Sequence, residues 1–493
     1  MIAQDQRSAP LAKDVHESLP LASGLPSSSS SPASVEAGPC VALLTPYNGG
    51  NLGDAAIQDA MISNLRRRMP GAQFWGITLN CDNFLKQHGV GAFPLLAASM
   101  PFSYRSMGRL TKKPTGAECS TIGSGTPGRT DRANRIRNAL RGLPGLVPFL
   151  KKVRDRVAVI HREIFHSFQG YRVLRKQDLL VVSGGGQLDE EWGGAWRLPF
   201  ALCKWVLLAR VAGVPCAVAS VGAGKLTSTA SRVFVSMALR MCCYRSYRES
   251  KSRAIAVSVL PRAMNDSVVP DLAFSLPDSE LPSLVTEIRT MACGRPVIAL
   301  SPICYAKPGN WPTPNRDLHD RYVQQMVQVL SSLSQRGNFL VIACSSLGDD
   351  EGVIPDLLGR SHEEMKHGTD SQIHFATVKT WRDLVSVLRD ADYLIASRLH
   401  GTILGFVTQT PVVAISFDPK VNWVMEDLQL TDYLLHIRDF TAEEVLGALD
   451  RIKVRRDVVV DRIASYRQSI LSASSQQYDS LSRLALTHHH SHN

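Results

Sequence analysis

The clearest evidence for the fold is the segment Tyr393-Leu394-Ile395-Ala396-Ser397-Arg398-Leu399-His400-Gly401. Its first four residues are apolar and predict a buried strand, and the residues after Ser397 open an apolar helix that runs to Phe406. A second apolar run at residues 412–415 follows and predicts the next strand. A strand, a helix and another strand in this order form a unit that builds parallel sheets.

The same alternation recurs in both halves of the chain. In the first half, the expected strands and helices alternate at residues 41–44, 54–68, 179–182, 196–212, 217–220 and 228–241. In the second half they alternate at residues 297–300, 319–335, 340–343, 384–388 and 393–396. This pattern predicts an α/β fold of two doubly wound, Rossmann-like domains that face a central crevice. Ligands bind such folds at the carboxyl ends of the strands.

Composition suggests where these domains begin and end. Residues 1–37 are rich in Ser, Pro and Ala and are expected to form a disordered lead. We expect the first domain at residues 38–280 and the second at residues 281–455, followed by a C-terminal helix and tail at residues 456–493. Residues 101–170 interrupt the first domain as an insertion, with a helix near residues 150–165.

Hydropathy and cysteine spacing exclude several classes of protein. No run of about 20 uncharged apolar residues is present, so no membrane span is expected. The first residues lack a basic stretch followed by an apolar core, which argues against a secretory signal and favours a cytoplasmic protein, free or peripheral at the inner face of the membrane. The ten cysteines show no C-x-x-C spacing, so neither a zinc site nor any other metal site is expected.

Positive charge is concentrated in one segment. Residues 101–165 contain 14 Lys or Arg and 4 Asp or Glu, which accounts for nearly all of the chain's net charge of +11. The segment predicts either a surface that meets anionic lipid headgroups or an anionic lipid-linked sugar, or a solvated insertion without a partner. No aromatic interleaving accompanies the charge, so nucleic acid is not an expected partner.

Two glycine-rich loops follow expected strands. In the first, Asn51, Gly53 and Asp54 lie between a strand and a helix, where free backbone N–H groups receive an anion; alternatively, Asp54 caps the helix. In the second, Gly184, Gly185 and Gly186 allow a ligand to approach the backbone or serve a tight strand exit. We treat both as candidate acceptor or phosphate loops. Neither has the spacing of a dinucleotide or P-loop motif.

Cations and one imidazole follow other expected strands. Arg248 comes after an expected strand at residues 241–244 and has the planar fork suited to a carboxylate or phosphate, or else pairs with Glu249 or Asp271 at the surface. Arg398 and His400 lie where the strand at residues 393–396 ends and the next helix begins, and Lys420 follows the next strand. This arrangement suits an anionic substrate that needs proton transfer.

These landmarks together resemble the polysaccharide pyruvyltransferase family. The resemblance covers residues 40–440, and its specific part is the motif Arg398-Leu399-His400-Gly401 combined with Asp418-Pro419-Lys420. It implies a two-domain fold of the GT-B type and transfer of a pyruvyl group from phosphoenolpyruvate to a hydroxyl pair of a polysaccharide or lipid-linked precursor, forming a ketal. It also implies that Arg398, Leu399, His400 and Arg248 lie at the donor and that Lys420 takes part in activity.

The residue types fit this chemistry independently of the resemblance. Arg248 and Arg398 suit the carboxylate and phosphate of phosphoenolpyruvate, and Lys420 adds a point charge. His400 is our candidate for acid–base catalysis, and no cofactor is expected beyond phosphoenolpyruvate as a co-substrate. Two alternatives stay open, namely a nucleotide-sugar glycosyltransferase of the same architecture and a non-catalytic scaffold for polysaccharide assembly.

Overall fold

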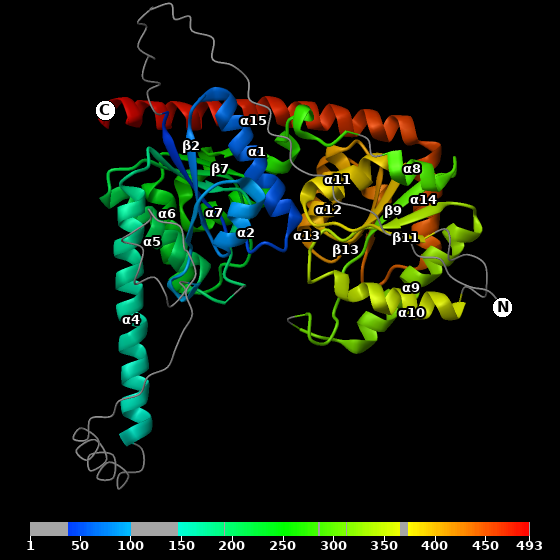
Figure 1. Ribbon diagram of the computed structural model, residues 1–493, viewed down its shortest axis with the longest axis horizontal. Coiled ribbons are helices and arrows are strands. Elements are labelled where there is room, and N and C mark those ends of the chain that lie inside the picture. The colour runs from blue at the N-terminus through cyan, green and yellow to red at the C-terminus, as the bar shows by residue number, and fades with distance from the viewer. Residues whose placement is uncertain are drawn as a thin grey trace, which may run out of the picture. The chain divides into compact units, whose positions relative to one another are not determined.

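The structure is a computed structural model that describes residues 38–99, 146–191, 193–283, 286–311, 313–364 and 373–492. The expected disordered lead at residues 1–37 and most of the basic insertion, residues 100–145, lie outside the described residues. Two parallel sheets organise the described chain, each built from strands that alternate with helices (Figure 1). No helix in the described ranges is long and apolar enough to cross a membrane.

The first sheet has the order β3-β2-β1-β4-β6-β7-β8, with β5 paired to β6. Its strands are β1 Cys40–Leu44, β2 Gln73–Thr78, β3 Ala92–Pro94, β4 Leu179–Ser183, β5 Gly186–Leu188, β6 Cys216–Ala223, β7 Tyr244–Tyr247 and β8 Ser267–Val268. Its helices are α1 Leu52–Arg68, α2 Cys81–His88, α4 Leu146–Leu174, α5 Leu198–Val211, α6 Thr229–Met241 and α7 Ser250–Val259. All of its strand pairs are parallel.

The second sheet has the order β11-β10-β9-β12-β13-β14 and is also wholly parallel. Its strands are β9 Val297–Ser301, β10 Phe339–Ile342, β11 Ile373–Phe375, β12 Tyr393–Ala396, β13 Val412–Ser416 and β14 Leu434–His436. The accompanying helices are α8 Thr286–Ala292, α9 Arg316–Gln335, α10 Ile354–Glu364, α11 Trp381–Asp390, α12 Leu399–Val407, α13 Pro419–Asp427 and α14 Ala442–Val454. The α/β, doubly wound prediction is therefore confirmed for both halves.

Alternate residues of the central strands pack into different cores, because successive side chains of a strand point to opposite faces. Val41 and Leu43 of β1 join a core with α1 that continues into the second sheet. Ala42 and Leu44 join a separate core with Trp205 of α5. Since one apolar core runs through both sheets, residues from Gly38 onward form one unit.

The last helix, α15 Arg456–His492, runs from α14 of the second sheet along the first (Figure 1). Buried Gln477 of this helix bonds Ser220 and Ser246 of the first sheet, and the Tyr478 hydroxyl lies 2.7 Å from that of Ser275. These contacts hold the C-terminal helix against the first sheet.

Two sequence expectations need correction. The strand expected at residues 241–244 is β7 Tyr244–Tyr247, because the amphipathic period of α6 continues to Met241. The helix expected near residues 150–165 is the longer α4 Leu146–Leu174, whose second half packs on α5. The shift of β7 matters for function because it places Arg248 directly at the end of the strand.

Candidate active site

The loop after β1 meets the second sheet directly. The Leu52 N–H donates to the Ser345 carbonyl at 3.2 Å, and the Leu347 N–H donates to the Gly50 carbonyl at 2.8 Å. Asn51 forms an isolated antiparallel bridge with Ser346 between these two bonds. The first glycine loop therefore lies against the strand end of β10, and residues from the two sheets come together here.

Asn51 holds both this loop and His400. Its side-chain oxygen accepts from the N–H groups of Gly53 at 3.0 Å and Asp54 at 3.4 Å, so Asn51, and not Asp54, caps α1. The same oxygen lies 3.0 Å from Nδ1 of His400. Because the two backbone donors identify this atom as an acceptor, Nδ1 must carry the proton that it shares with Asn51.

His400 is almost fully buried in the first turn of α12. A Cβ atom added to Gly53 would lie 1.9 Å from Cγ of His400, so the imidazole packs against bare backbone. The other ring nitrogen, Nε2, has no hydrogen-bond partner among the described residues and lies 3.8 Å from Oδ2 of Asp271. The ring is thus fixed through Nδ1, while Nε2 faces an acidic group and is available for proton transfer.

Arg248 is buried and paired twice. Its Nε donates to Glu249 at 2.9 Å and its Nη1 donates to Asp271 at 3.1 Å, whereas Nη2 is buried without a partner among the described residues. The sequence left a surface pair open as an alternative, but the side chain is only 5% exposed. Arg248 therefore offers its Nη2 amino group to a ligand, not the full fork.

The pKa values of two carboxylates in the cluster, Asp271 and Asp54, shift in opposite directions. Burial alone would raise the pKa of Asp271, but the contacts and charges of His400 and Arg248 outweigh it and lower the pKa to about 2. Burial raises the pKa of Asp54, although His400, Arg248 and Lys420 oppose this shift. Asp271 therefore stays ionised, whereas Asp54 holds a proton more readily than an ordinary aspartate.

Lys420 and the second glycine loop meet at this cluster. Lys420 lies in the first turn of α13, where Asp418 caps the helix by accepting from the Lys420 N–H at 3.0 Å. A Cβ atom added to Gly186 would lie 3.7 Å from Nζ of Lys420, and one added to Gly185 would lie 3.7 Å from Oδ1 of Asp54. The structure thus brings the glycine run, Lys420 and Asp54 together from three strand ends.

Gly184 and Gly185 also have positive φ angles of 53° and 67°, which favour glycine. Gln187 fixes this turn, because its side-chain amide donates to the carbonyls of Leu44 at 3.0 Å and Gly184 at 2.9 Å. The run is therefore a rigid strand exit, in which Gly184 is needed for packing because an added Cβ atom would lie 2.6 Å from Ile57.

Arg398 points to a different partner. Its Nε and Nη2 donate to the two carboxylate oxygens of Asp350 at 2.5 and 2.7 Å. Asp350 is fully buried, and sequence reasoning missed it because no motif surrounds it. In this structure the bidentate fork of Arg398 is occupied by Asp350.

Two serines were also missed. The hydroxyls of Ser301 and Ser345 are buried and have no partner within the described ranges. A Cβ atom added to Gly401 would lie 3.1 Å from the first and 3.4 Å from the second. Among the described residues no side chain caps α12, and the Thr402 N–H donates to the Arg398 carbonyl at 3.0 Å. The amino end of α12 and the two hydroxyls together suit an anion.

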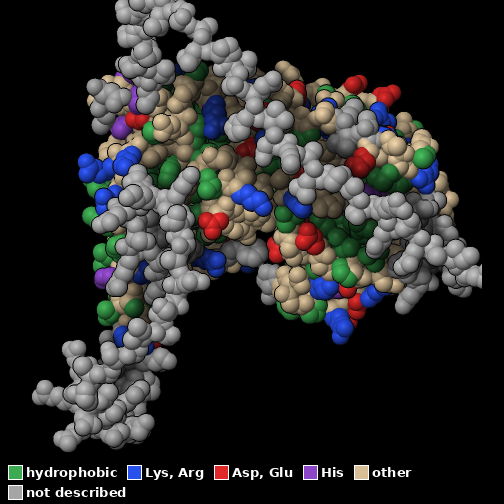
Figure 2. Space-filling model, viewed as in Figure 1, with side chains coloured by type: hydrophobic (Ala, Val, Ile, Leu, Met, Phe, Trp, Pro, Cys, Tyr) green, Lys and Arg blue, Asp and Glu red, His purple; other side chains and the backbone are tan. Residues whose placement is uncertain are grey.

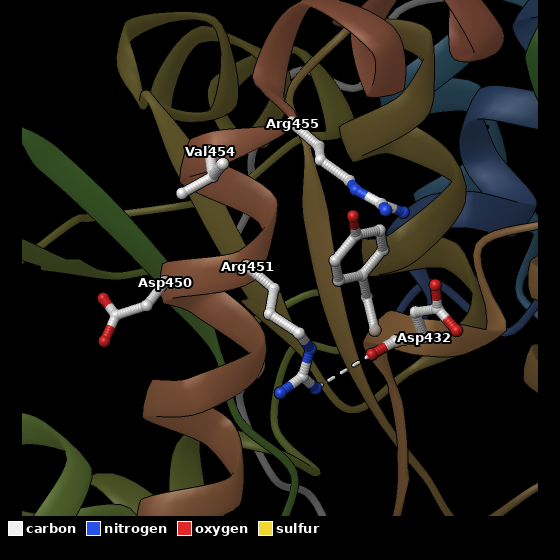
Figure 3. A pocket seen from close by; sticks show the side chains of 6 residues that line it. Asp432, Asp450, Arg451, Val454 and Arg455 are labelled. Carbon is white, nitrogen blue, oxygen red and sulfur yellow. Dashed lines mark hydrogen bonds between the residues drawn. The ribbon is translucent and has the colours of Figure 1, made fainter.

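The surface hollow in Figure 3 lies apart from this cluster. It is lined by Asp432, Tyr433, Asp450, Arg451, Val454 and Arg455. Arg451 donates to the backbone carbonyl of Asp432 at 3.1 Å and is thereby engaged within the protein. None of these residues belongs to a predicted motif. Within the described ranges, no three His, Cys, Asp or Glu side chains are grouped to hold a metal ion.

Two doubly wound parallel sheets whose strand ends supply one polar cluster define a two-domain α/β protein of the GT-B-like class. The sequence model of the family described as polysaccharide pyruvyl transferase matches residues 51–419. The chain therefore belongs to that family, as the resemblance of its motifs predicted. The match begins at Asn51, which binds His400, and ends one residue before Lys420.

Several solved structures are similar to the chain at low sequence identity. A structure from Listeria monocytogenes assigned as a UDP-N-acetylglucosamine 2-epimerase has a TM-score of 0.53 at 10% identity and covers 90% of this chain and 97% of its own. A UDP-GlcNAc 2-epimerase from Neisseria meningitidis has a TM-score of 0.49 at 11% identity, with coverages of 90% and 98%. An ADP-heptose lps heptosyltransferase II from E. coli has a TM-score of 0.40 at 12% identity, with coverages of 85% and 99%. No curated protein sequence matches the chain.

Proposed function

We propose that this protein transfers the pyruvyl group of phosphoenolpyruvate to two hydroxyl groups of a sugar, forming a ketal and releasing phosphate. The observation that carries the proposal is the position of His400, whose Nδ1 is held by Asn51 while Nε2 faces Asp271 without a hydrogen bond from the described residues. Membership of the pyruvyl transferase family supports the same reaction.

The donor carries a phosphate and a carboxylate, and the cluster offers two places for anions. The uncapped amino end of α12 with Ser301 and Ser345 suits the phosphate. Lys420 and the free Nη2 of Arg248 suit the carboxylate, since both are cationic donors. The sequence suggested that Arg248 and Arg398 each bind the donor with the whole guanidinium. In this arrangement only Nη2 of Arg248 does so, because Nε and Nη1 of Arg248 and Nε and Nη2 of Arg398 bind carboxylates of the protein.

Ketal formation moves two protons. One sugar hydroxyl attacks the central carbon of phosphoenolpyruvate while the methylene carbon gains a proton and becomes a methyl group. The second hydroxyl then attacks the same carbon, the bond to the phosphate oxygen breaks, and phosphate leaves with the remaining proton. The step balances with phosphoenolpyruvate as the only co-substrate.

His400 is the proposed carrier of these protons through Nε2. Asp271 stabilises the protonated ring, because its low pKa keeps it ionised. Asp54, with its raised pKa, is the second group able to hold a proton. The acceptor, an oligosaccharide free or linked to a lipid, would lie along Gly185 and Gly186, where no side chain blocks its approach to Lys420.

Phosphate release from phosphoenolpyruvate tests the proposal, measured with and without a panel of free and lipid-linked oligosaccharides. We expect acceptor-dependent release that is lost in His400→Ala but retained in His436→Ala, a matched control whose side chain is 53% exposed. Silence with phosphoenolpyruvate, together with consumption of nucleotide sugars, would establish the glycosyltransferase alternative. Absence of both activities in the unaltered protein, with polysaccharide assembly intact in the His400→Ala strain, would favour the scaffold.

A further inference from the structure

Helix α4 carries an apolar stripe that no other described element covers. Val157, Ile160, Ile164 and Phe168 follow one another at intervals of three or four residues and therefore lie on one side of the helix. Each of these side chains is between 57 and 65% exposed. An unpaired row of large apolar side chains is unfavourable in water and marks an interaction surface.

The opposite side of α4 anchors the helix to the first sheet. His166 is buried and lies 2.8 Å from the Pro94 carbonyl through Nε2. A Cβ atom added to Gly170 would lie 2.8 Å from the Trp205 ring of α5. Glu163 pairs with Lys204 at 2.5 Å. Because these residues fix the buried side, the apolar stripe is held outward and is not a misplaced part of the core.

The neighbouring helices also carry exposed apolar side chains. Helix α5 packs against both α4 and α6. Exposed Leu207 and Val211 lie on α5, and exposed Val233 and Met237 lie on α6. Among the large apolar side chains that are exposed in the described chain, 11 of 17 belong to α4, α5, α6 or the Trp196 that precedes α5. The exposed apolar residues are thus gathered on this group of helices, which we name the α4–α6 face.

Positive charge accompanies these apolar residues. The sequences of α4, α5 and α6 contain ten Lys or Arg and two Asp or Glu. Each of the two acids is paired, Glu163 with Lys204 and Asp155 with the exposed Arg154. Hydrophobic and basic side chains are both visible along the described part of α4 (Figure 2). An apolar stripe with basic flanks is typical of helices that lie in the interface of an anionic membrane. A second copy of the chain would place like charges opposite each other, which is unfavourable.

We propose that the α4–α6 face docks on an anionic lipid bilayer. The stripe of Val157, Ile160 and Ile164 would enter the boundary between headgroups and acyl chains, and Arg154 and Arg156, which lie one turn before Val157 and Ile160, would meet lipid phosphates. This inference goes beyond the proposed function and does not depend on it, because vesicle binding needs neither phosphoenolpyruvate nor an acceptor. It assigns the membrane contact to a defined apolar surface as well as to basic charge.

Co-sedimentation of the full chain with lipid vesicles tests this docking. We expect binding to vesicles of phosphatidylcholine and phosphatidylglycerol in equal parts, little binding to phosphatidylcholine alone, and weakening by salt. The double variant Ile160→Asp with Ile164→Asp should abolish binding. Its matched control is Val454→Asp with Val458→Asp, which changes two residues that are 87% and 58% exposed on other helices and should bind normally. Arg154→Gln and Arg156→Gln should each weaken binding about fivefold.

Three results would overturn the docking proposal. The first is no vesicle binding by the unaltered protein, which would mean that another segment covers the face. The second is equal binding by the stripe variant and its control. The third is a molar mass in solution that falls in the stripe variant while vesicle binding persists, which would assign the stripe to a second copy. Urea unfolding shows whether each variant is folded, and phosphate release with free oligosaccharides, measured in parallel, tests the proposed function separately.

Discussion

A Cβ atom on Gly53 would lie 1.9 Å from Cγ of His400, so the imidazole of the second domain packs directly on the backbone of a helix of the first. Asn51, two residues earlier, accepts from the same ring at 3.0 Å. The position of the proposed proton carrier therefore depends on how the two domains meet. Even small side-chain substitutions at this contact should therefore lower activity strongly.

Gly53→Ala should displace the ring of His400. The added methyl group overlaps Cγ, and relief of such overlap by shifts of packed atoms costs about 1–3 kcal/mol of stability. A displacement of about 1 Å at a catalytic group reduces turnover about a hundredfold. Steady-state kinetics of phosphate release and urea unfolding measure the two effects. Gly359→Ala is the control, because it lies within α10 with nothing within 4 Å of an added Cβ. Equal behaviour of the two variants would contradict the packing argument.

His400→Ala should lower kcat about 10²- to 10⁴-fold while the affinity for phosphoenolpyruvate changes little, because general acid–base catalysis is lost but the anion sites remain. Single-turnover kinetics combined with equilibrium binding of the donor separate the two quantities. A variant that binds the donor poorly but turns over bound donor normally would assign His400 to binding instead.

Asn51→Ala should affect stability and catalysis together. Loss of the α1 cap costs about 1 kcal/mol. Loss of the hydrogen bond to Nδ1 should reduce kcat roughly fivefold to tenfold and alter the pH profile, since the ring is no longer held as one tautomer. Asn315→Ala is the matched control, because Asn315 caps α9 in the same way but bonds only Leu318 through its side chain. The control should show the loss of stability without the change in the pH profile.

Asp271 should make stability depend on acid pH. Its folded-state pKa of about 2 lies below the ordinary value of 3.8, so its contribution is fully present above about pH 4 and is lost as the pH falls toward 2. The shift corresponds to about 2 kcal/mol. Urea unfolding over this range should show a shallower acid dependence in Asp271→Asn than in Asp439→Asn, an exposed control. Parallel curves for the two variants would show that Asp271 is not stabilised in this way.

Arg398→Ala should destabilise the second domain by about 3–5 kcal/mol, because buried Asp350 would lose the cation that pairs with both of its oxygens. Adding Asp350→Ala should restore part of this stability. The KM for phosphoenolpyruvate in the double variant then decides whether Arg398 also touches the donor. A raised KM at restored stability supports donor contact, and an unchanged KM limits Arg398 to positioning the amino end of α12.

Lys420→Ala should raise the KM for phosphoenolpyruvate about tenfold or more, because a charged hydrogen-bond donor contributes about 1.5–3 kcal/mol. The KM for the saccharide acceptor should change less. Lys453→Ala, a change on α14 away from the cluster, is the control. Equal increases in the two KM values would place Lys420 between donor and acceptor.

Most elements of the fold and the residue types of the site could be predicted from local sequence patterns. Strands such as β4 and β12 were predictable, because an apolar run bounded by glycine or polar residues reflects hydrogen bonding and burial that are local along the chain. The error at β7 arose where the apolar residues of α6 run directly into the strand, so no local signal separates them. Family membership also followed from the spacing of the motifs.

The partners of these side chains became known from the tertiary structure. Arg398 and Asp350 are 48 residues apart, and His400 and Asn51 are 349 apart, so no local pattern announces either pair. An arginine at a strand end can bind a ligand or pair with a buried carboxylate. Which of these happens depends on which strand ends are neighbours in space. The strand ends become neighbours when the two sheets pack on a shared apolar core. Hydrophobic packing depends on the whole chain and not on the residues around a motif.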